Sequence, residues 1–146
     1  MSDVLTGQCL CGAVRFTVKP EVAADGIHLD ACHCSMCRRL VGSALMGLNL
    51  LEAPKVEDNT HLTSYASSDW ATRQFCAVCG SNLFYQMNDG SLFTVIAGAL
   101  DDIPDARFAK EIFIDEKPDY YDFAQPTYKM TGAEVLAAFA GNGQEG

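Results

Sequence analysis

Seven cysteines in three short groups limit the fold and chemistry of this 146-residue chain more than any other feature of its sequence. They lie in the motifs QCLCG (8–12), ACHCSMC (31–37) and FCAVCG (75–80). In a reducing compartment, closely spaced thiols are typical of metal binding or catalysis and not of a disulfide framework. The sequence therefore predicts metal sites.

The two doublets and the triplet divide the sulfurs into a set of four and a set of three. The first set is Cys9, Cys11, Cys76 and Cys79. It would enclose one zinc ion, because structural zinc takes four protein ligands. That ion would clip the first strand to the middle of the chain and close a long loop, where a cross-link gains most stability.

The second set, Cys32, Cys34 and Cys37, lies within six residues and can bind an ion by itself. Three protein ligands and an open fourth position are typical of catalytic zinc. Zinc on three thiolates carries a net negative charge, so it is poorly suited to acidifying water, but it still deprotonates a coordinating thiol. The predicted chemistry is capture of an external thiol and its addition to a small electrophile.

The spacing leaves two alternatives open. Cys76 and Cys79 could form a redox-active dithiol. His28 or His33 could close the second site, which would make both zinc ions structural. His33 lies between two ligands, so we expect its side chain to point away from the metal, whereas His28, in an upstream loop, could reach it.

Short segments of strand character recur between turn residues and predict a mainly β fold. They are AVRFTV (13–18), ALMGLNL (44–50), HLTSYA (61–66), SNLFYQM (81–87), SLFTVIAGAL (91–100) and KEIFI (110–114). Asp89 and Gly90 predict a hairpin between two of them.

Two helices are expected, a short one over 35–42 and a C-terminal one over 131–141. The second is the clearer, because Thr131 and Glu134 have the spacing of a capping box. A chain of this length can bury a sizeable core, so one domain over 1–146 is predicted.

The composition, 49% hydrophobic and 20% charged, is that of an ordinary soluble globule. The formal net charge of -9 disfavours nucleic acid and anionic membranes as partners. The first residues lack the pattern of a secretory signal, and no stretch approaches the ~20 apolar residues of a spanning helix. The expected location is the cytoplasm.

Four motifs occur together in the order and approximate spacing of a known family. They are GQCLCGAVRFTV, ACHCSMCRRLVGS, SYASSDWATRQFCAVCGSNLFY and VIAGALDD. Over about residues 5–122 the chain resembles the glutathione-dependent formaldehyde-activating enzyme family, also called the CENP-V/GFA domain. The resemblance implies an Mss4-like (β-tent) zinc-binding fold, with the set of four cysteines on structural zinc and the set of three on catalytic zinc. The implied activity is that of a carbon-sulfur lyase, which adds glutathione to formaldehyde to form S-(hydroxymethyl)glutathione.

The chain departs from this family at places that concern substrate contacts. The family often has His before an IFV-like strand and Trp after the following Lys. This chain has Glu111 at the first place and Tyr120 or Tyr121 at the second. The two tyrosines lie near an acidic loop and are candidates to wall a pocket.

Other polar residues near the cysteines have two interpretations each. Arg38 and Arg39 could bind glutathione carboxylates, since Arg offers bidentate geometry, or could lie on a solvated helix face. Arg73 could brace the four-cysteine site or form a cross-strand ion pair. Ser81 and Asn82 could donate hydrogen bonds to zinc-bound sulfur or to a ligand, or could be turn residues.

A non-enzymatic zinc module is the competing hypothesis, one that carries glutathione or binds a protein partner. A nucleic-acid zinc ribbon is disfavoured by the acidic composition. The sequence leaves the aldehyde and the oligomeric state open.

Overall fold

The structure, a computed structural model, describes residues 4–139. The strands are β1 (Leu5–Gln8), β2 (Arg15–Val18), β3 (Ile27–Cys32), β4 (Leu45–Leu50), β5 (Lys55–Val56), β6 (Leu62–Ala66), β7 (Ala71–Cys76), β8 (Asn82–Met87), β9 (Phe93–Ile96), β10 (Ala106–Ile112) and β11 (Tyr128–Met130). The helices are α1 (Ser35–Val41) and α2 (Gly132–Phe139), with 3₁₀ turns at Asn59–His61, Ala97–Ala99 and Ile114–Glu116. Neither α-helix is long and apolar enough to cross a bilayer.

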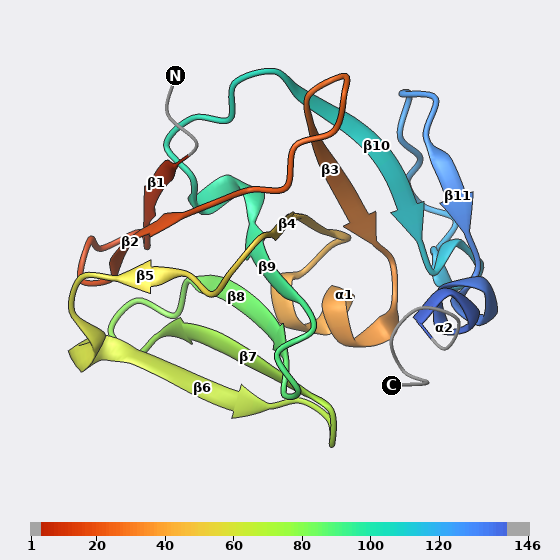
Figure 1. Ribbon diagram of the computed structural model, residues 1–146. Coiled ribbons are helices and arrows are strands. Elements are labelled where there is room, and N and C mark those ends of the chain that lie inside the picture. Colours follow the sequence, from red (N-terminus) through yellow and green to blue (C-terminus); the bar gives the residue numbers. More distant parts are fainter. Residues whose placement is uncertain (1–3, 140–146) are drawn as a thin grey trace.

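The strands form two sheets (Figure 1). The longer sheet has eight strands in the order β11-β10-β3-β4-β9-β8-β7-β6, and the shorter one has the order β1-β2-β5. Strand β10 runs parallel to both of its neighbours, β3 and β11, whereas the other pairs are antiparallel. The mainly β fold predicted from the sequence is confirmed.

An apolar core joins the two sheets. Phe16 of β2 is 1% exposed, and its ring meets that of Phe84 from β8 edge to face, with the ring centroids 4.8 Å apart. Gly7 of β1 also bridges Leu100, just beyond β9. A Cβ atom at Gly7 would lie 2.5 Å from the backbone oxygen of Ala99, so only glycine permits this approach. The sheets are therefore in direct contact beside the first cysteine doublet.

All six predicted strand segments contain a strand, but five strands were not predicted: β1, β3, β5, β7 and β11. Strand β7 turns Arg73 and Cys76 inward, so its buried face does not show an apolar pattern. Strand β9 ends at Ile96, earlier than predicted, because the 3₁₀ turn over Ala97–Ala99 redirects the chain toward β1. Asp89 and Gly90 lie in the connection between β8 and β9, which pair antiparallel as predicted.

Both predicted helices are present. Helix α1 ends at Val41, with Gly42 at a φ of +90° as its C-cap. Thr131 and Glu134 form the predicted capping box: the Thr131 amide donates to Glu134 Oε1 (2.8 Å), and the Glu134 amide donates to Thr131 Oγ1 (3.2 Å). The predicted end of this helix, residues 140 and 141, lies outside the described residues.

Replacing Phe16 by Ala tests whether the core joins the two sheets. We expect Phe16→Ala to lower the free energy of unfolding by about 3–5 kcal/mol, because it leaves a cavity between them. Denaturant unfolding of the metal-loaded protein would measure this, with Leu10→Ala as the control, since Leu10 is 86% exposed. Equal stability of the two variants would contradict this account of the core.

Candidate metal centres

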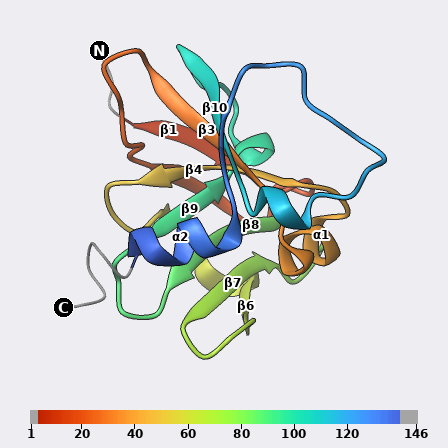
Figure 2. The same ribbon diagram turned by 90° about the vertical axis from the view of Figure 1, so that its right-hand side faces the viewer.

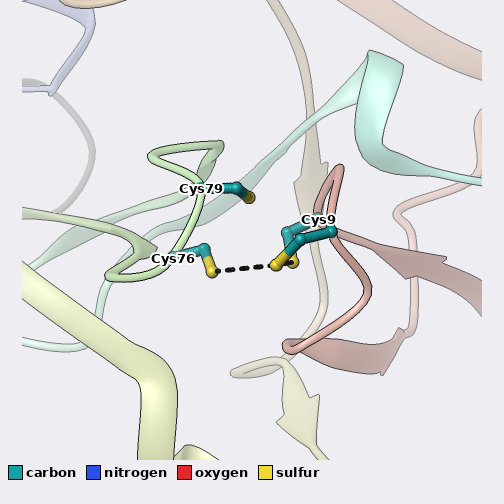
Figure 3. Close-up of side chains that lie close together, drawn as sticks. Cys9, Cys76 and Cys79 are labelled. Carbon is teal, nitrogen blue, oxygen red and sulfur yellow. Dashed lines mark hydrogen bonds between the residues drawn. The ribbon is translucent and has the colours of Figure 1, made fainter.

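Four sulfurs from distant parts of the chain converge on one volume. Cys9 and Cys11 lie in the turn after β1. Cys76 ends β7, and Cys79 lies in the turn that follows; Figure 3 shows these two side chains facing Cys9. The four Sγ atoms all lie within 4.8 Å of one another. The Cys9 and Cys11 sulfurs are 3.7 Å apart, and those of Cys11 and Cys76 are 3.8 Å apart. A tetrahedron with Zn–S bonds of ~2.3 Å requires S···S separations of about 3.8 Å, so this donor set fits zinc.

Two similar turns carry these sulfurs. The Gly12 amide donates to the Cys9 carbonyl (3.2 Å), and the Gly80 amide donates to the Cys76 carbonyl (2.8 Å). Both glycines adopt left-handed backbone angles, with φ of +83° and +80°. The Val14 amide also donates to the Cys9 sulfur (3.3 Å). Both turns are therefore tight, and in the first one an amide points at a ligand sulfur.

Ser81 supports this site, whereas Asn82 does not. The hydroxyl of Ser81 accepts from the Leu10 amide (2.9 Å) and lies 3.2 Å from the Cys79 sulfur, to which it can donate. Hydrogen bonding by Ser81 lowers the pKa of the Cys79 thiol to about 5. Asn82 instead donates to the Leu40 carbonyl in α1 (3.2 Å).

The second group consists of Cys32 at the end of β3, Cys34 at the N-cap of α1, and Cys37 in the first turn of α1. Their Sγ atoms also lie within 4.8 Å of one another. The Cys37 amide donates to the Cys34 sulfur (3.3 Å), so the helix start orients this side chain. Within residues 4–139, no further histidine, cysteine or acidic side chain joins the group. Among the described residues the group therefore offers three ligands to an ion.

Both candidate histidines are engaged elsewhere. His28 lies in β3 and not in a loop, and its Nε2 is 2.6 Å from Asp25 Oδ1. His33 is fully buried and contacts Glu111 and Tyr121, so its side chain points away from the sulfurs as expected. The open-site hypothesis gains support from this arrangement.

Close contact between the three sulfurs sets their proton affinities. Hydrogen bonds from the Cys32 and Cys37 thiols lower the pKa of Cys34. The pKa of Cys32 is raised, because this thiol donates to Cys34 and lies beside Cys37. Three adjacent thiolates repel one another unless a cation lies between them. The positive charge of a bound divalent ion would offset this repulsion and keep all three thiols deprotonated.

Arg73 supplies a buried positive charge to the three-cysteine group. It is 4% exposed, and its Nη1 atom lies 3.5 Å from the Cys37 sulfur. Its guanidinium also lies over the Tyr85 ring, 4.7 Å from the centroid. Both interpretations of Arg73 from the sequence, a brace for the four-cysteine site and a cross-strand ion pair, are therefore wrong. A divalent ion on three thiolates would carry a single negative charge, which this guanidinium can balance.

The two arginines of α1 differ in their surroundings. Arg38 is half-buried, and its Nε donates to the His33 carbonyl (2.9 Å), between two of the sulfur ligands. Arg39 is exposed. Arg38 thus stabilises the loop between Cys32 and Cys34. Arg39 lies on the same helix as Cys37, and its charge faces solvent.

A cleft of about 530 Å³ lies against the four-cysteine site, and its lining includes none of the three cysteines of the second group. Its walls include Cys9 and Ser81 from the four-cysteine site. They also include Val41 and Ile96, which pack against the three-cysteine group. A molecule in this cleft would contact residues that support both sites.

The tyrosine pair does not form the pocket wall that the sequence suggested. A smaller pocket of about 300 Å³ is lined by Asp119, Asp122 and Phe123 of the same loop. Tyr120 is 80% exposed, and the hydroxyl of Tyr121 is bonded to His33.

Comparison with known proteins identifies the family of this chain. A sequence model described as glutathione-dependent formaldehyde-activating enzyme matches residues 4–116, most of the chain. The chain belongs to the glutathione-dependent formaldehyde-activating enzyme family. This confirms the resemblance drawn from the motifs.

Two named proteins and one crystal structure are similar to the chain. An uncharacterized lyase of Schizosaccharomyces pombe is 34% identical over 131 residues, covering 89% of this chain and 93% of that protein. A Halomonas elongata protein, provisionally named a glutathione-dependent formaldehyde-activating enzyme, is 31% identical over 129 residues, covering 82% of this chain and 80% of its own. A crystal structure of a Rhodobacter sphaeroides protein matches with a TM-score of 0.54 and 28% identity, covering 68% of this chain and 90% of that one.

The contact between Arg73 and Cys37 gives a testable expectation. Replacing Arg73 by Met should weaken divalent-metal binding at the three-cysteine group about tenfold, because an outer contact that balances the ligand charge is lost. Cobalt titration, followed by the thiolate-to-metal charge-transfer band, would measure this. Arg107→Met is the control, since Arg107 is exposed and pairs with Asp25. Equal affinities in both variants would contradict the assigned role.

Proposed function

We propose that this protein is a zinc-dependent carbon-sulfur lyase, which binds a thiol such as glutathione at the three-cysteine site and adds it to a small aldehyde such as formaldehyde. The observation that carries the proposal is the grouping of three thiols with a fourth ligand position that neither His28 nor His33 fills. Membership of the family, and the name of the Halomonas relative, support the choice of glutathione and formaldehyde.

In this proposal the chain binds two zinc ions with different roles. Cys9, Cys11, Cys76 and Cys79 hold a structural ion, and the other three cysteines hold the catalytic one. The catalytic ion would supply the positive charge that keeps an incoming thiol in its thiolate form.

The remaining parts of the site bind and orient the reactants. Arg73 balances the charge of the three thiolates, and Arg38 and Arg39 attract the carboxylates of glutathione. The thiolate sulfur attacks the aldehyde carbon, a carbon–sulfur bond forms, and the carbonyl π bond breaks. The oxygen takes up one proton, which matches the proton that the thiol gives up on binding.

Burial of the ligands favours one alternative, a zinc module that carries glutathione without turnover. Cys34 and Cys37 are only 8% and 6% exposed, which restricts the space for an aldehyde beside the bound thiol. Such a module would bind glutathione but would not accelerate its reaction.

Zinc stoichiometry and X-ray absorption, measured with and without glutathione, test the proposal. We expect two zinc ions per chain, and replacement of a light-atom ligand by sulfur at one of them when glutathione is added. Exchange spectroscopy on labelled formaldehyde should show faster formation of the hemithioacetal. Sulfur binding without acceleration would favour the carrier, and absence of zinc from carefully purified protein would remove both.

Single cysteine replacements separate the two sites. Cys34→Ser should retain one zinc ion and lose the acceleration, because only the catalytic site loses a ligand. Cys76→Ser should instead lower the melting temperature, since it opens the site that links the two sheets. Acceleration that persists in Cys34→Ser would contradict the assignment of the catalytic site.

The exposed arginine of α1 provides a test of substrate binding. Arg39→Ala should raise the KM for glutathione about three- to tenfold with kcat unchanged, because a charge contact to a carboxylate is lost. Arg107→Ala, which removes an exposed cation elsewhere, should leave KM unchanged. A normal KM in Arg39→Ala would show that this residue does not contact glutathione.

A further inference from the structure

His33 is anchored through every one of its hydrogen-bonding groups. Its amide donates to the Ile112 carbonyl (3.1 Å), and its carbonyl accepts from Arg38 Nε (2.9 Å). In the ring, Nε2 lies 2.8 Å from Glu111 Oε1, and Nδ1 lies 2.7 Å from the hydroxyl of Tyr121. The residue between two sulfur ligands is therefore fixed in both its backbone and its side chain.

Burying the carboxylate of Glu111 costs solvation free energy, and polar partners contact both of its oxygens. It is 1% exposed, and an unpaired carboxylate in such a place is strongly destabilising. Its Oε2 accepts from the Thr127 hydroxyl (2.5 Å) and lies 3.7 Å from Lys129 Nζ. Burial raises the pKa of Glu111, but hydrogen bonds from Thr127 and His33 outweigh it and hold this pKa below its usual value.

The direction of the hydrogen bonds follows from this charge. An ionised carboxylate only accepts, so His33 Nε2 carries the proton that is donated to Glu111. On the other side of the ring, Nδ1 shares a hydrogen bond with the hydroxyl of Tyr121. One continuous chain of hydrogen bonds thus runs from Tyr121 through His33 to Glu111.

Much of this network comes from residues beyond the region that the family's sequence model matches. The match ends at residue 116, whereas Tyr121, Thr127 and Lys129 lie after it. Figure 2 shows the chain between β10 and α2 extending outward in a long loop before it returns. Glu111 itself stands where the family often has His. Part of the support of His33 thus comes from residues that lie beyond the match to the family model.

We propose that Glu111 and Tyr121 are positioning residues that act through His33 to fix the loop between Cys32 and Cys34, so that the three sulfurs are preorganised for one metal ion. The inference rests on the proposed function, since it requires a metal at the three-cysteine site. Ligands held in place by buried hydrogen bonds lose less conformational freedom when the ion binds, and outer contacts of this kind are worth about 10- to 100-fold in metal affinity.

Metal affinities of both sites in a small set of variants test the proposal. Competition with a chromophoric zinc chelator would resolve the two affinities, and the ligand-field bands of the cobalt-loaded protein would report coordination geometry. Tyr121→Phe and Glu111→Leu should each weaken binding at the three-cysteine site about tenfold and leave the four-cysteine site unchanged. Glu111→Gln keeps an acceptor for His33 Nε2 and should recover most of the affinity.

The chain offers a matched control. Tyr120→Phe removes the hydroxyl of the neighbouring tyrosine, which is 80% exposed, and should change neither affinity. Tyr121→Phe and Glu111→Gln keep the shape of the side chains, so the test remains decisive if Glu111→Leu does not fold.

Three results would overturn the proposal. Native affinity at the three-cysteine site in Tyr121→Phe would show that the network does not position the sulfurs. Equal losses at both sites with a lower melting temperature would show a general structural role. Failure of the unaltered protein to bind metal at the three-cysteine site would overturn the proposed function as well, whereas the first two results leave that function intact.

Discussion

The convergence of four sulfurs from two separate turns is the constraint on which the rest of the structure depends. One turn extends from the three-stranded sheet and the other from the end of β7 in the eight-stranded sheet, so the cluster and the Phe16–Phe84 contact hold the same two layers together. The close approach at Gly7 brings the first turn into range. With the two sheets held together there, the end of β3 and the start of α1 place the other three sulfurs beside buried Arg73.

The three-cysteine group combines features that usually oppose each other. Its sulfurs are crowded, which penalises their charged forms, yet Arg73 and the Cys37 amide supply positive character to individual sulfurs. A fully enclosed site would satisfy all of these charges within the chain. In the proposed function this group instead takes an ion and an outside ligand, which is the arrangement expected of a site that works on other molecules.

The grouping of the cysteines into two doublets and one triplet predicted the division of the sulfurs into four and three, because two doublets together supply the four ligands of structural zinc. The strand segments with clear alternation were predictable for the same local reason. Strand β7 was not, since its inward positions hold Arg73 and Cys76 in place of apolar side chains. The contacts of Arg73 with Cys37, and of His33 with Glu111 and Tyr121, join residues far apart in sequence, and no local pattern specifies such pairs. Glu111 was noticed only as a departure from the family.

The long separation between His33 and its supports also bears on how the protein matures during synthesis. The four-cysteine cluster has all of its ligands once residue 79 has been translated. The loop that carries the triplet receives its last anchors only after Tyr121, Thr127 and Lys129 leave the ribosome. Because chains fold from the N-terminus as they emerge, the scaffold would be assembled first and the reactive centre last. In a nascent chain, the ligands of the four-cysteine site would thus be complete before the three-cysteine group has its supports.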